Sequence, residues 1–345
     1  MKFKIYLSLI LSFLLLNAEV FAGGGNRNGT AGASELLIPV GTRGIAMGSS
    51  IVTNSKGLDA LYFNPANLSR AEFNTNIFLS NMTHIADISV QYGAISTKVD
   101  GFGSIAFDIK SLNIGDIEET TVDAPEGTGS TFSPQVMTIG LTYANSISDR
   151  ISVGLTANYI SEKIALVSAS GIAFNIGLAY SNLANVSGLD FGIVIRNLGP
   201  SMKYDGSGLN IKAVASSLNR PQQYYKIEAA SFELPASLEM GVGYQMQLDK
   251  QNDLLVTSSF ESNNFYGDQY KIGAEYGFDK MFYARAGYSI APEMDADYNT
   301  YGLTAGVGIH YQLSEGVNII VDYAYRAVKF DALGDNHVIS VGLGL

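Results

Sequence analysis

Apolar and polar residues alternate with a period of two along most of the chain, which is the pattern of β-strands that have one apolar face. Between 151 and 159 every odd position is apolar and every even position is small or polar. The same alternation recurs at 282–290, 300–311 and 317–326. Each of these segments therefore predicts a strand with one apolar face and one small or polar face.

About fourteen segments of this kind follow residue 73. An even number is what single-chain bacterial β-barrels require. The predicted strands lie near 74–84, 86–98, 102–113, 134–145, 151–159, 169–181, 187–198, 234–248, 253–263, 268–277, 282–290, 300–311, 317–326 and 336–345.

The connections between these strands fall into two groups. Short turns at one end and long loops at the other are typical of outer-membrane barrels, in which the short turns are periplasmic. This pattern places both termini on the periplasmic side. The short connections lie near 99–101, 146–149, 182–186, 249–252, 278–280 and 312–316, and the mostly long ones near 114–133, 199–233, 291–298 and 327–335.

A soluble β-sandwich would also alternate, but its outer face would be polar and rich in charges. Here the polar face consists mainly of Gly, Ser, Thr and Asn with few charges, which suits a barrel interior. Aromatic residues at strand ends resemble the interfacial girdles of membrane barrels. We therefore predict an all-β fold, a transmembrane antiparallel β-barrel whose outer face contacts lipid of the bacterial outer membrane. The aromatic residues are Tyr143, Tyr159, Tyr180, Tyr244, Tyr311 and Tyr323.

Residues 41–70 show neither a clean two-residue alternation nor a long helical stripe, so they read as an insert in the barrel. A barrel of about fourteen strands needs its lumen filled, and residues 23–72 are the available filler. Inward glycines leave room for backbone to approach the wall. The predicted plug motif consists of Gly41, Gly44, Gly48, Asn64, Pro65 and Ala66, and the inward glycines are Gly140, Gly154, Gly177, Gly243, Gly273, Gly306 and Gly342.

The N-terminus has the features of a cleaved secretory signal. Lys2 and Lys4 precede an apolar run from 5 to 16, and Val20-Phe21-Ala22 provides small residues for a signal peptidase. A signal anchor is the alternative, but no basic stop-transfer flank follows. The predicted division is thus a signal peptide at 1–22, a plug at 23–72 and a barrel at 73–345.

Composition narrows the function further. The chain has a formal net charge of −11 and no basic stripe, so a nucleic-acid partner is not expected. It has no cysteine, which excludes disulfides, thiolate zinc sites and a Cys nucleophile. The three histidines, His84, His310 and His337, are far apart in sequence and suggest ordinary wall or loop residues. We predict a non-enzymatic protein with no catalytic, metal or cofactor site.

Charged residues on the face assigned to the lumen are the candidate functional groups. Lys271/Glu275 and Asp322/Arg326 are spaced four residues apart, too far for direct contact along one strand, so partners must come from neighbouring strands or the plug. The set predicts either a pairing network that holds the plug to the wall or a polar path for a solute. It consists of Asp190, Arg196, Glu239, Lys271, Glu275, Arg285, Asp322 and Arg326.

Two motifs carry a resemblance to a known family. The segment from Ala33 through Arg70, which contains LLIPVGTRGIAMGSS and then LDALYFNPANLS, closely resembles the N-terminal signature of the PorV/PorQ family. It is more distantly similar to FadL-like fatty-acid transport barrels, which carry a similar Asn-Pro-Ala in their plug. Asn197-Leu198-Gly199-Pro200 and the later Leu234-Pro235-Ala236 are also like PorV-type proteins.

The resemblance implies a FadL-like outer-membrane barrel. Some family members act in type IX secretion, where they receive cargo and pass it to the surface attachment machinery, so secretion-system subunits and cargo domains are the implied partners. The second hypothesis is a FadL-like transporter of hydrophobic small molecules such as long-chain fatty acids. The chain departs from the pattern in ending with Leu345 instead of an aromatic residue, and in its long 199–233 loop.

Overall fold

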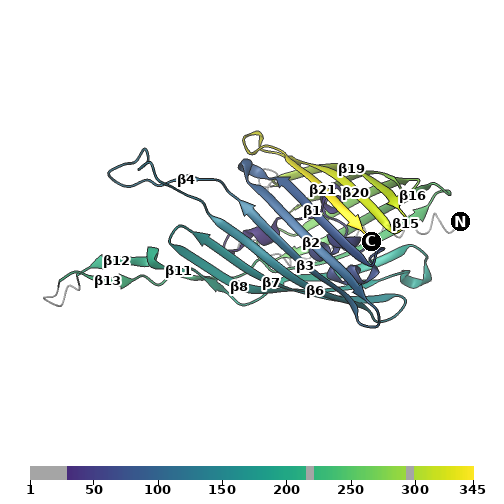
Figure 1. Cartoon of the computed structure of the whole chain (residues 1–345), viewed down its shortest axis with the longest axis horizontal. Coiled ribbons are helices and arrows are strands. Elements are labelled where there is room, and N and C mark those ends of the chain that lie inside the picture. Colours follow the sequence, from purple (N-terminus) through teal and green to yellow (C-terminus); the bar gives the residue numbers. More distant parts are fainter. Residues whose placement is uncertain (1–28, 215–220, 293–298) are drawn as a thin grey trace.

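The structure, a computed structural model, describes residues 29–214, 221–292 and 299–345. Fourteen long antiparallel strands form a closed barrel (Figure 1). The ring closes because β1 pairs with β21, and β9 pairs with both β8 and β15. The predicted all-β barrel is therefore confirmed.

Each of the predicted segments coincides with one strand of the wall. The strands are β1 (Thr75–Thr83), β2 (Ser89–Val99), β3 (Gly103–Asn113), β6 (Gln135–Ser146), β7 (Ile151–Ile164), β8 (Val167–Tyr180), β9 (Leu189–Leu198), β15 (Ser237–Gln247), β16 (Asn252–Asn263), β17 (Gln269–Phe278), β18 (Phe282–Ile290), β19 (Tyr301–Ser314), β20 (Val317–Val328) and β21 (Asn336–Gly344).

Two hairpins project from the same end of the barrel (Figure 1). One pairs β4 (Ile117–Glu118) with β5 (Thr131–Phe132), and the other pairs β12 (Asn210–Ala213) with β13 (Gln223–Lys226). The second belongs to the connection 199–236, which also contains β10 (Met202–Lys203), β11 (Asp205–Gly206) and β14 (Ser231–Phe232). The other short elements are η5 (Ile85–Asp87), η6 (Leu183–Asn185), η7 (Ser207–Leu209) and η9 (Asp331–Leu333).

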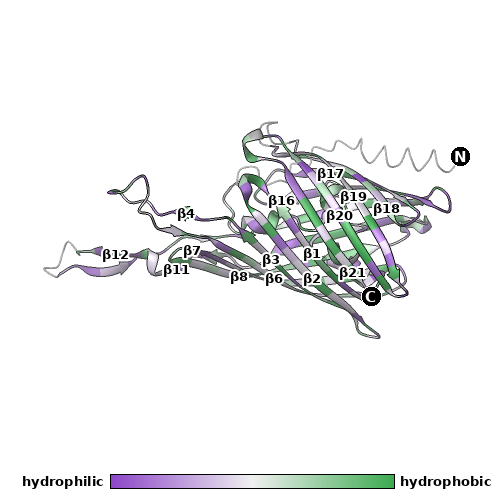
Figure 2. Ribbon diagram, turned by 45° about the horizontal axis from the view of Figure 1, so that its top comes forward, coloured by the Kyte–Doolittle hydropathy of each residue, from purple (hydrophilic) through white to green (hydrophobic). Residues whose placement is uncertain are grey.

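The outer surface of the wall is apolar. Leu141, Leu155, Leu303 and Val307 point outward and are 46–59% exposed, and Figure 2 shows hydrophobic stretches along the barrel strands. An exposed apolar surface of this size marks a contact surface for another protein or for a membrane. A closed barrel can span a lipid bilayer because all its backbone hydrogen bonds are paired between strands. Among the described residues, no helix is both long and apolar enough to cross a membrane.

The described part of the N-terminus, residues 29–72 and here called the N-terminal segment, lies inside the barrel (Figure 1). Its helices are short because glycine and proline interrupt them: Gly41 and Gly48 adopt φ of 98° and 63°, and Pro65 forces the preceding residue into extended backbone. These helices are η2 (Ser34–Leu37), α2 (Thr42–Ala46), η3 (Gly57–Asp59), α3 (Ala60–Phe63) and η4 (Pro65–Arg70).

The N-terminal segment runs lengthwise through the lumen. Near its start, the Gly32 amide donates to the Glu233 carbonyl of the long 199–236 connection at 3.2 Å. Near its end, the Arg70 guanidinium donates to the Arg150 carbonyl, in the short turn between β6 and β7, at 3.0 Å. The backbone of Leu345 forms hydrogen bonds with Thr75, the first residue of β1. The predicted signal peptide lies outside the described residues.

Candidate functional site

The Asn-Pro-Ala turn is tied both to itself and to the wall. The Asn64 side-chain oxygen accepts from the Ala66 amide at 3.1 Å, and its nitrogen donates to the carbonyls of Val52 at 2.8 Å and Leu178 at 3.1 Å. Leu178 belongs to β8, so one asparagine fixes the turn and attaches it to a barrel strand. An uncapped buried turn would leave these backbone groups without partners, at about 1–3 kcal/mol each.

Glycines on both surfaces allow the N-terminal segment to approach the wall at backbone distance. A Cβ on Gly154 would lie within 3 Å of backbone atoms of Pro65 and Ala66, and one on Gly287 within 3 Å of the Gly48 amide. Within the segment, a Cβ on Gly44 would collide with the Phe63 ring. The glycines therefore set how closely two backbones meet. Of the predicted inward glycines, those against the segment are Gly154, Gly177, Gly243, Gly273 and Gly306, whereas Gly140 and Gly342 face other wall residues.

One buried charge network joins the N-terminal segment to β17, β18 and β20. Arg43 donates to the Glu275 carboxylate from Nε at 2.6 Å and from Nη2 at 2.9 Å. Arg285 donates to the same carboxylate at 2.7 Å and to Asp322 at 2.5 Å. Burial alone would lower the pKa of Arg43, but the Glu275 carboxylate outweighs it and holds that pKa above its usual range. Two cations and two carboxylates thus balance within one cluster.

A second network spans β9, β15, β16 and β17. Arg196 Nη2 donates to Glu239 at 2.6 Å and to Glu261 at 2.5 Å. Lys271 donates to Glu239 at 3.3 Å and also to Glu261. All four side chains are buried, so each charge depends on the others for compensation.

The remaining two predicted charges lie outside both networks. Asp190 accepts from the Asn54 side chain at 2.9 Å and from the Asn182 amide at 3.1 Å. Arg326 stacks on the Tyr301 ring, with its guanidinium carbon 3.8 Å from the ring centroid. The structure therefore places all eight predicted charges on the lumen face and joins six of them, three in each network.

Several charged residues of the lumen and of the N-terminal segment were not predicted from the sequence. Glu261 and Lys110 could have been found, because both fall on the inward face of alternating strands. Arg43 could not, because nothing periodic in the N-terminal segment indicates where its side chains point. Glu35 was also missed: its carboxyl group faces Glu162 of β7, and burial, reinforced by that neighbour, raises the pKa of Glu35 to about 7.

A cavity of about 470 Å³ lies in the lumen between the N-terminal segment and the end of the barrel that carries the longer loops. The four charged side chains of the second network line this cavity, and so do Tyr62 and Phe63 of the N-terminal segment. One part of its wall is apolar, so the cavity offers both a hydrophobic surface and buried polar groups. The apolar lining consists of Leu37, Ile38, Pro39, Ile85, Ile88, Leu112, Ile114 and Val136.

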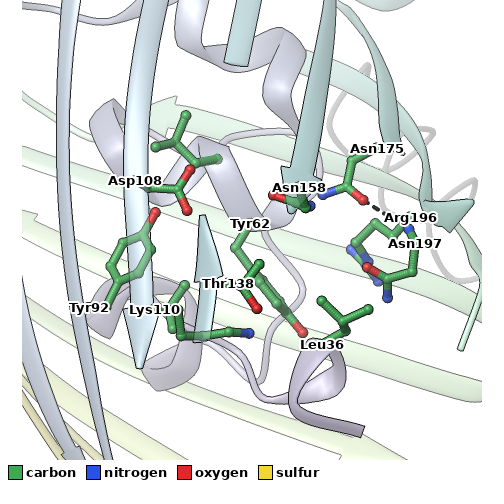
Figure 3. A pocket seen from close by; sticks show the side chains of 12 residues that line it. Leu36, Tyr62, Tyr92, Asp108, Lys110, Thr138, Asn158, Asn175, Arg196 and Asn197 are labelled. Carbon is green, nitrogen blue, oxygen red and sulfur yellow. Dashed lines mark hydrogen bonds between the residues drawn. The ribbon is translucent and has the colours of Figure 1, made fainter. Parts of the chain in front are cut away.

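Tyr62 lines both this cavity and a recess of about 40 Å³ between the N-terminal segment and the wall, and Figure 3 shows the recess. The Tyr62 ring lies 5.7 Å from the Lys110 ammonium and 5.8 Å from the Arg196 guanidinium, both within cation–π range. Its hydroxyl donates to the Leu37 carbonyl at 3.1 Å. These contacts fix the position of the Tyr62 side chain, which borders both spaces.

The recess reaches an irregular part of the wall, between β8 and β9. Asn197 adopts φ of 57°, and the β8–β9 register shifts between Phe174 and Ile176. The Asn197 side chain donates to the Pro235 carbonyl at 3.0 Å. The two later motifs of the sequence, around Asn197 and Pro235, thus meet at this bend. Within the described ranges, no cluster of three or more His, Asp or Glu is arranged to hold a metal ion.

Neither family models nor curated proteins match the chain. Solved structures do. The chain matches the monoaromatic hydrocarbon channel CymD with a TM-score of 0.56 and 16% identity, over 89% of this chain and 97% of that one. It matches the toluene transporter TodX of Pseudomonas putida with a TM-score of 0.55 and 13% identity, over 88% and 96%.

A FadL homologue of Pseudomonas aeruginosa also matches, with a TM-score of 0.51 and 14% identity, over 88% of this chain and 97% of the homologue. The barrel has a FadL-like fold. At these identities the likeness concerns the fold alone, and the PorV/PorQ resemblance rests on the sequence motifs quoted above.

Proposed function

We propose that the protein is an outer-membrane channel that binds and passes hydrophobic small molecules. The observation that carries this proposal is the cavity of about 470 Å³, which has an apolar wall and is bounded below by the N-terminal segment. The matching proteins include channels for monoaromatic hydrocarbons and a toluene transporter. Ligand pockets of this size, mainly apolar with a few fixed polar groups, are typical small-molecule sites.

The N-terminal segment acts in this proposal as a plug. Its glycine contacts and the Arg43–Glu275 pair attach it to the wall on several sides. A plug that fills the lumen keeps water and ions from passing while a ligand binds above it. Deleting residues 23–70 should raise ion conductance in planar bilayers, and unchanged conductance would contradict the plug.

Uptake tests the transport function. Full-length protein is expressed in bacteria that lack their own hydrocarbon channel, and the initial uptake of radiolabelled toluene and decanoate is measured. Val136→Trp, on the apolar cavity wall, should reduce uptake of at least one probe severalfold. Leu141→Trp is the matched control, because Leu141 lies on the same strand and points outward with 59% exposure. Equal uptake by both variants and by cells without the protein would refute the proposal.

Type IX secretion is the second candidate. The projecting β12–β13 hairpin favours it, since Tyr224 and Ile227 are 70% and 50% exposed there and offer a contact surface for another protein. The match to solved hydrocarbon channels supports small-molecule transport better. Capture of the detergent-solubilised protein by an immobilised C-terminal secretion domain, and its loss when the hairpin is replaced by a short turn, would favour the secretion function.

A further inference from the structure

Two buried oxygen atoms in the recess beside Tyr62 have no hydrogen-bond partner among the described residues. They are Oδ1 of Asp108, on β3, and Oγ1 of Thr138, on β6. Asp108 is 8% exposed and Thr138 is 4% exposed, and Figure 3 shows both side chains at the recess. A buried polar atom without a partner is costly, so these oxygens call for an occupant of the recess.

A third oxygen converges on the same place. Asp108, Gly140 and Asn158 are neighbours in the register of β3, β6 and β7. A Cβ added to Gly140 would lie 2.3 Å from Asp108 Oδ1 and 2.9 Å from Asn158 Oδ1, so the two oxygens flank a position that a glycine leaves open. A carboxylate oxygen and an amide oxygen are both acceptors. Only a hydrogen-bond donor or a cation can satisfy both of them there.

Asp108 shares the cation near it with two other carboxyl groups. Lys110 acts on the charge of Asp108, but its ammonium donates to backbone carbonyls of the N-terminal segment and interacts more strongly with Glu35. Glu35 in turn faces Glu162, so even when these two glutamates share one proton, two negative charges meet the single charge of Lys110. Arg196 also lines the recess, but it is balanced within the second charge network. One negative charge therefore remains at the recess.

We infer that the recess binds a monovalent cation such as Na⁺ through the Asp108 carboxylate, the Asn158 amide oxygen and the Thr138 hydroxyl. Oxygen atoms of these kinds are the ligands that hard cations take in proteins, and a recess of about 40 Å³ has room for an ion of this size. Water would bond to the same oxygens but would leave the negative charge uncompensated. No pattern in the sequence predicts this site, because its ligands come from three strands. The inference does not depend on the proposed transport function.

Exchange of sodium for a cation too large for the recess tests the inference. The full chain in detergent micelles is unfolded with urea, in sodium chloride or in N-methylglucamine chloride of equal ionic strength, and tyrosine fluorescence is recorded. Sodium should move the unfolding midpoint to a higher urea concentration, because a ligand that binds only the folded state stabilises it. The shift should follow a saturating curve as sodium replaces N-methylglucamine, whereas screening depends on ionic strength alone.

Two variants remove the site in different ways. Asp108→Asn removes the charge and keeps the shape, whereas Gly140→Ala keeps every ligand and places a Cβ between the oxygens of Asp108 and Asn158. Both should lose the difference between the two salts. Asp190→Asn is the matched control, because Asp190 is a lumen carboxylate outside the recess that accepts from Asn54, and it should keep the sodium shift. Heat-modifiable migration in SDS gels shows that each barrel is folded.

Two results would overturn the inference. Equal midpoints in the two salts would mean that Asp108 carries a proton and donates it to Asn158, with no cation bound. A sodium shift that survives in Asp108→Asn would place the ion elsewhere in the protein. If Gly140→Ala does not fold, Asp108→Asn decides alone, since its amide can donate to the Asn158 oxygen. Neither result bears on small-molecule transport, because Asp108 does not line the large cavity.

Discussion

Arg43 and Glu275 lie 232 residues apart in sequence, yet their side chains form a two-point ion pair inside the barrel, with N–O distances of 2.6 and 2.9 Å. This pair attaches the N-terminal segment to β17. Glu275 also accepts from Arg285 of the wall. The carboxylate therefore serves two cations, and the two partners of the pair are not equivalent.

Removing Glu275 should cost more than removing Arg43. Glu275→Gln leaves two buried guanidinium groups undercompensated, and loss of one member of a buried pair costs about 3–5 kcal/mol. Arg43→Met leaves Glu275 paired with Arg285, so we expect a smaller loss of about 1–3 kcal/mol. Urea titration of the barrel, followed by tyrosine fluorescence, measures both. Equal losses would show that Arg285 does not share the carboxylate.

Gly287→Ala should detach the N-terminal segment from β18. The added Cβ would lie within 3 Å of the Gly48 amide and of Met47 backbone atoms, which cannot rotate away as a side chain can. We expect about 1–3 kcal/mol of destabilisation, as for overpacking elsewhere, and higher ion conductance. Gly302→Ala on the adjacent strand is the control, since nothing lies within 4 Å of its Cβ position. Similar conductance in both variants would argue against close packing at Gly287.

The strands could be read from the sequence because alternation reports directly which surroundings each face meets. The boundaries were less accurate. The predicted 151–159 strand runs on to Ile164, because Glu162 faces inward and Lys163 outward, so polar residues on both faces hide the alternation. The 199–233 loop contains short paired strands that no local pattern distinguishes from a loop.

The charge networks were only partly predictable, because alternation shows which face a side chain is on but not which residues it contacts. Inward charges such as Glu239 and Lys271 follow from the faces of their strands, but which charge meets which depends on strand order and on the N-terminal segment. That segment has irregular backbone, so the orientation of Arg43 and Tyr62 follows from packing against the wall and not from spacing in the sequence.

Docking of the start of the N-terminal segment should weaken as pH rises. The pKa of Glu35 is raised from 4.5 to about 7 by burial and by the facing Glu162. Well below pH 4.5 the group is protonated whether the segment is docked or not. Between pH 4.5 and 7 the docked state holds the proton more tightly, so docking loses free energy with increasing pH, up to about 3 kcal/mol above pH 7.

A spin label reports this change, because the chain has no native cysteine and a single Leu37→Cys can be labelled selectively. The mobile fraction of the label should grow between pH 5 and 8. Glu35→Gln removes the titrating group and should give a flat response at the low-pH level. The same pH dependence in Glu35→Gln would assign the titration to another residue.

Tyr62 should control the opening between the large cavity and the recess. Its ring lies between Lys110 and Arg196 and borders both spaces, so Tyr62→Ala joins them and exposes charged groups to the enlarged path. We expect a higher single-channel conductance and a stability loss below the about 3–5 kcal/mol of fully buried aromatics, because Tyr62 is only partly buried. Tyr62→Phe keeps the ring and loses only the hydrogen bond to the Leu37 carbonyl, about 1 kcal/mol, so its conductance should match that of the unmodified protein. Planar-bilayer recordings of both variants distinguish a ring that closes the path from a hydroxyl that merely positions the segment, and unchanged conductance in Tyr62→Ala would show that the path is closed elsewhere.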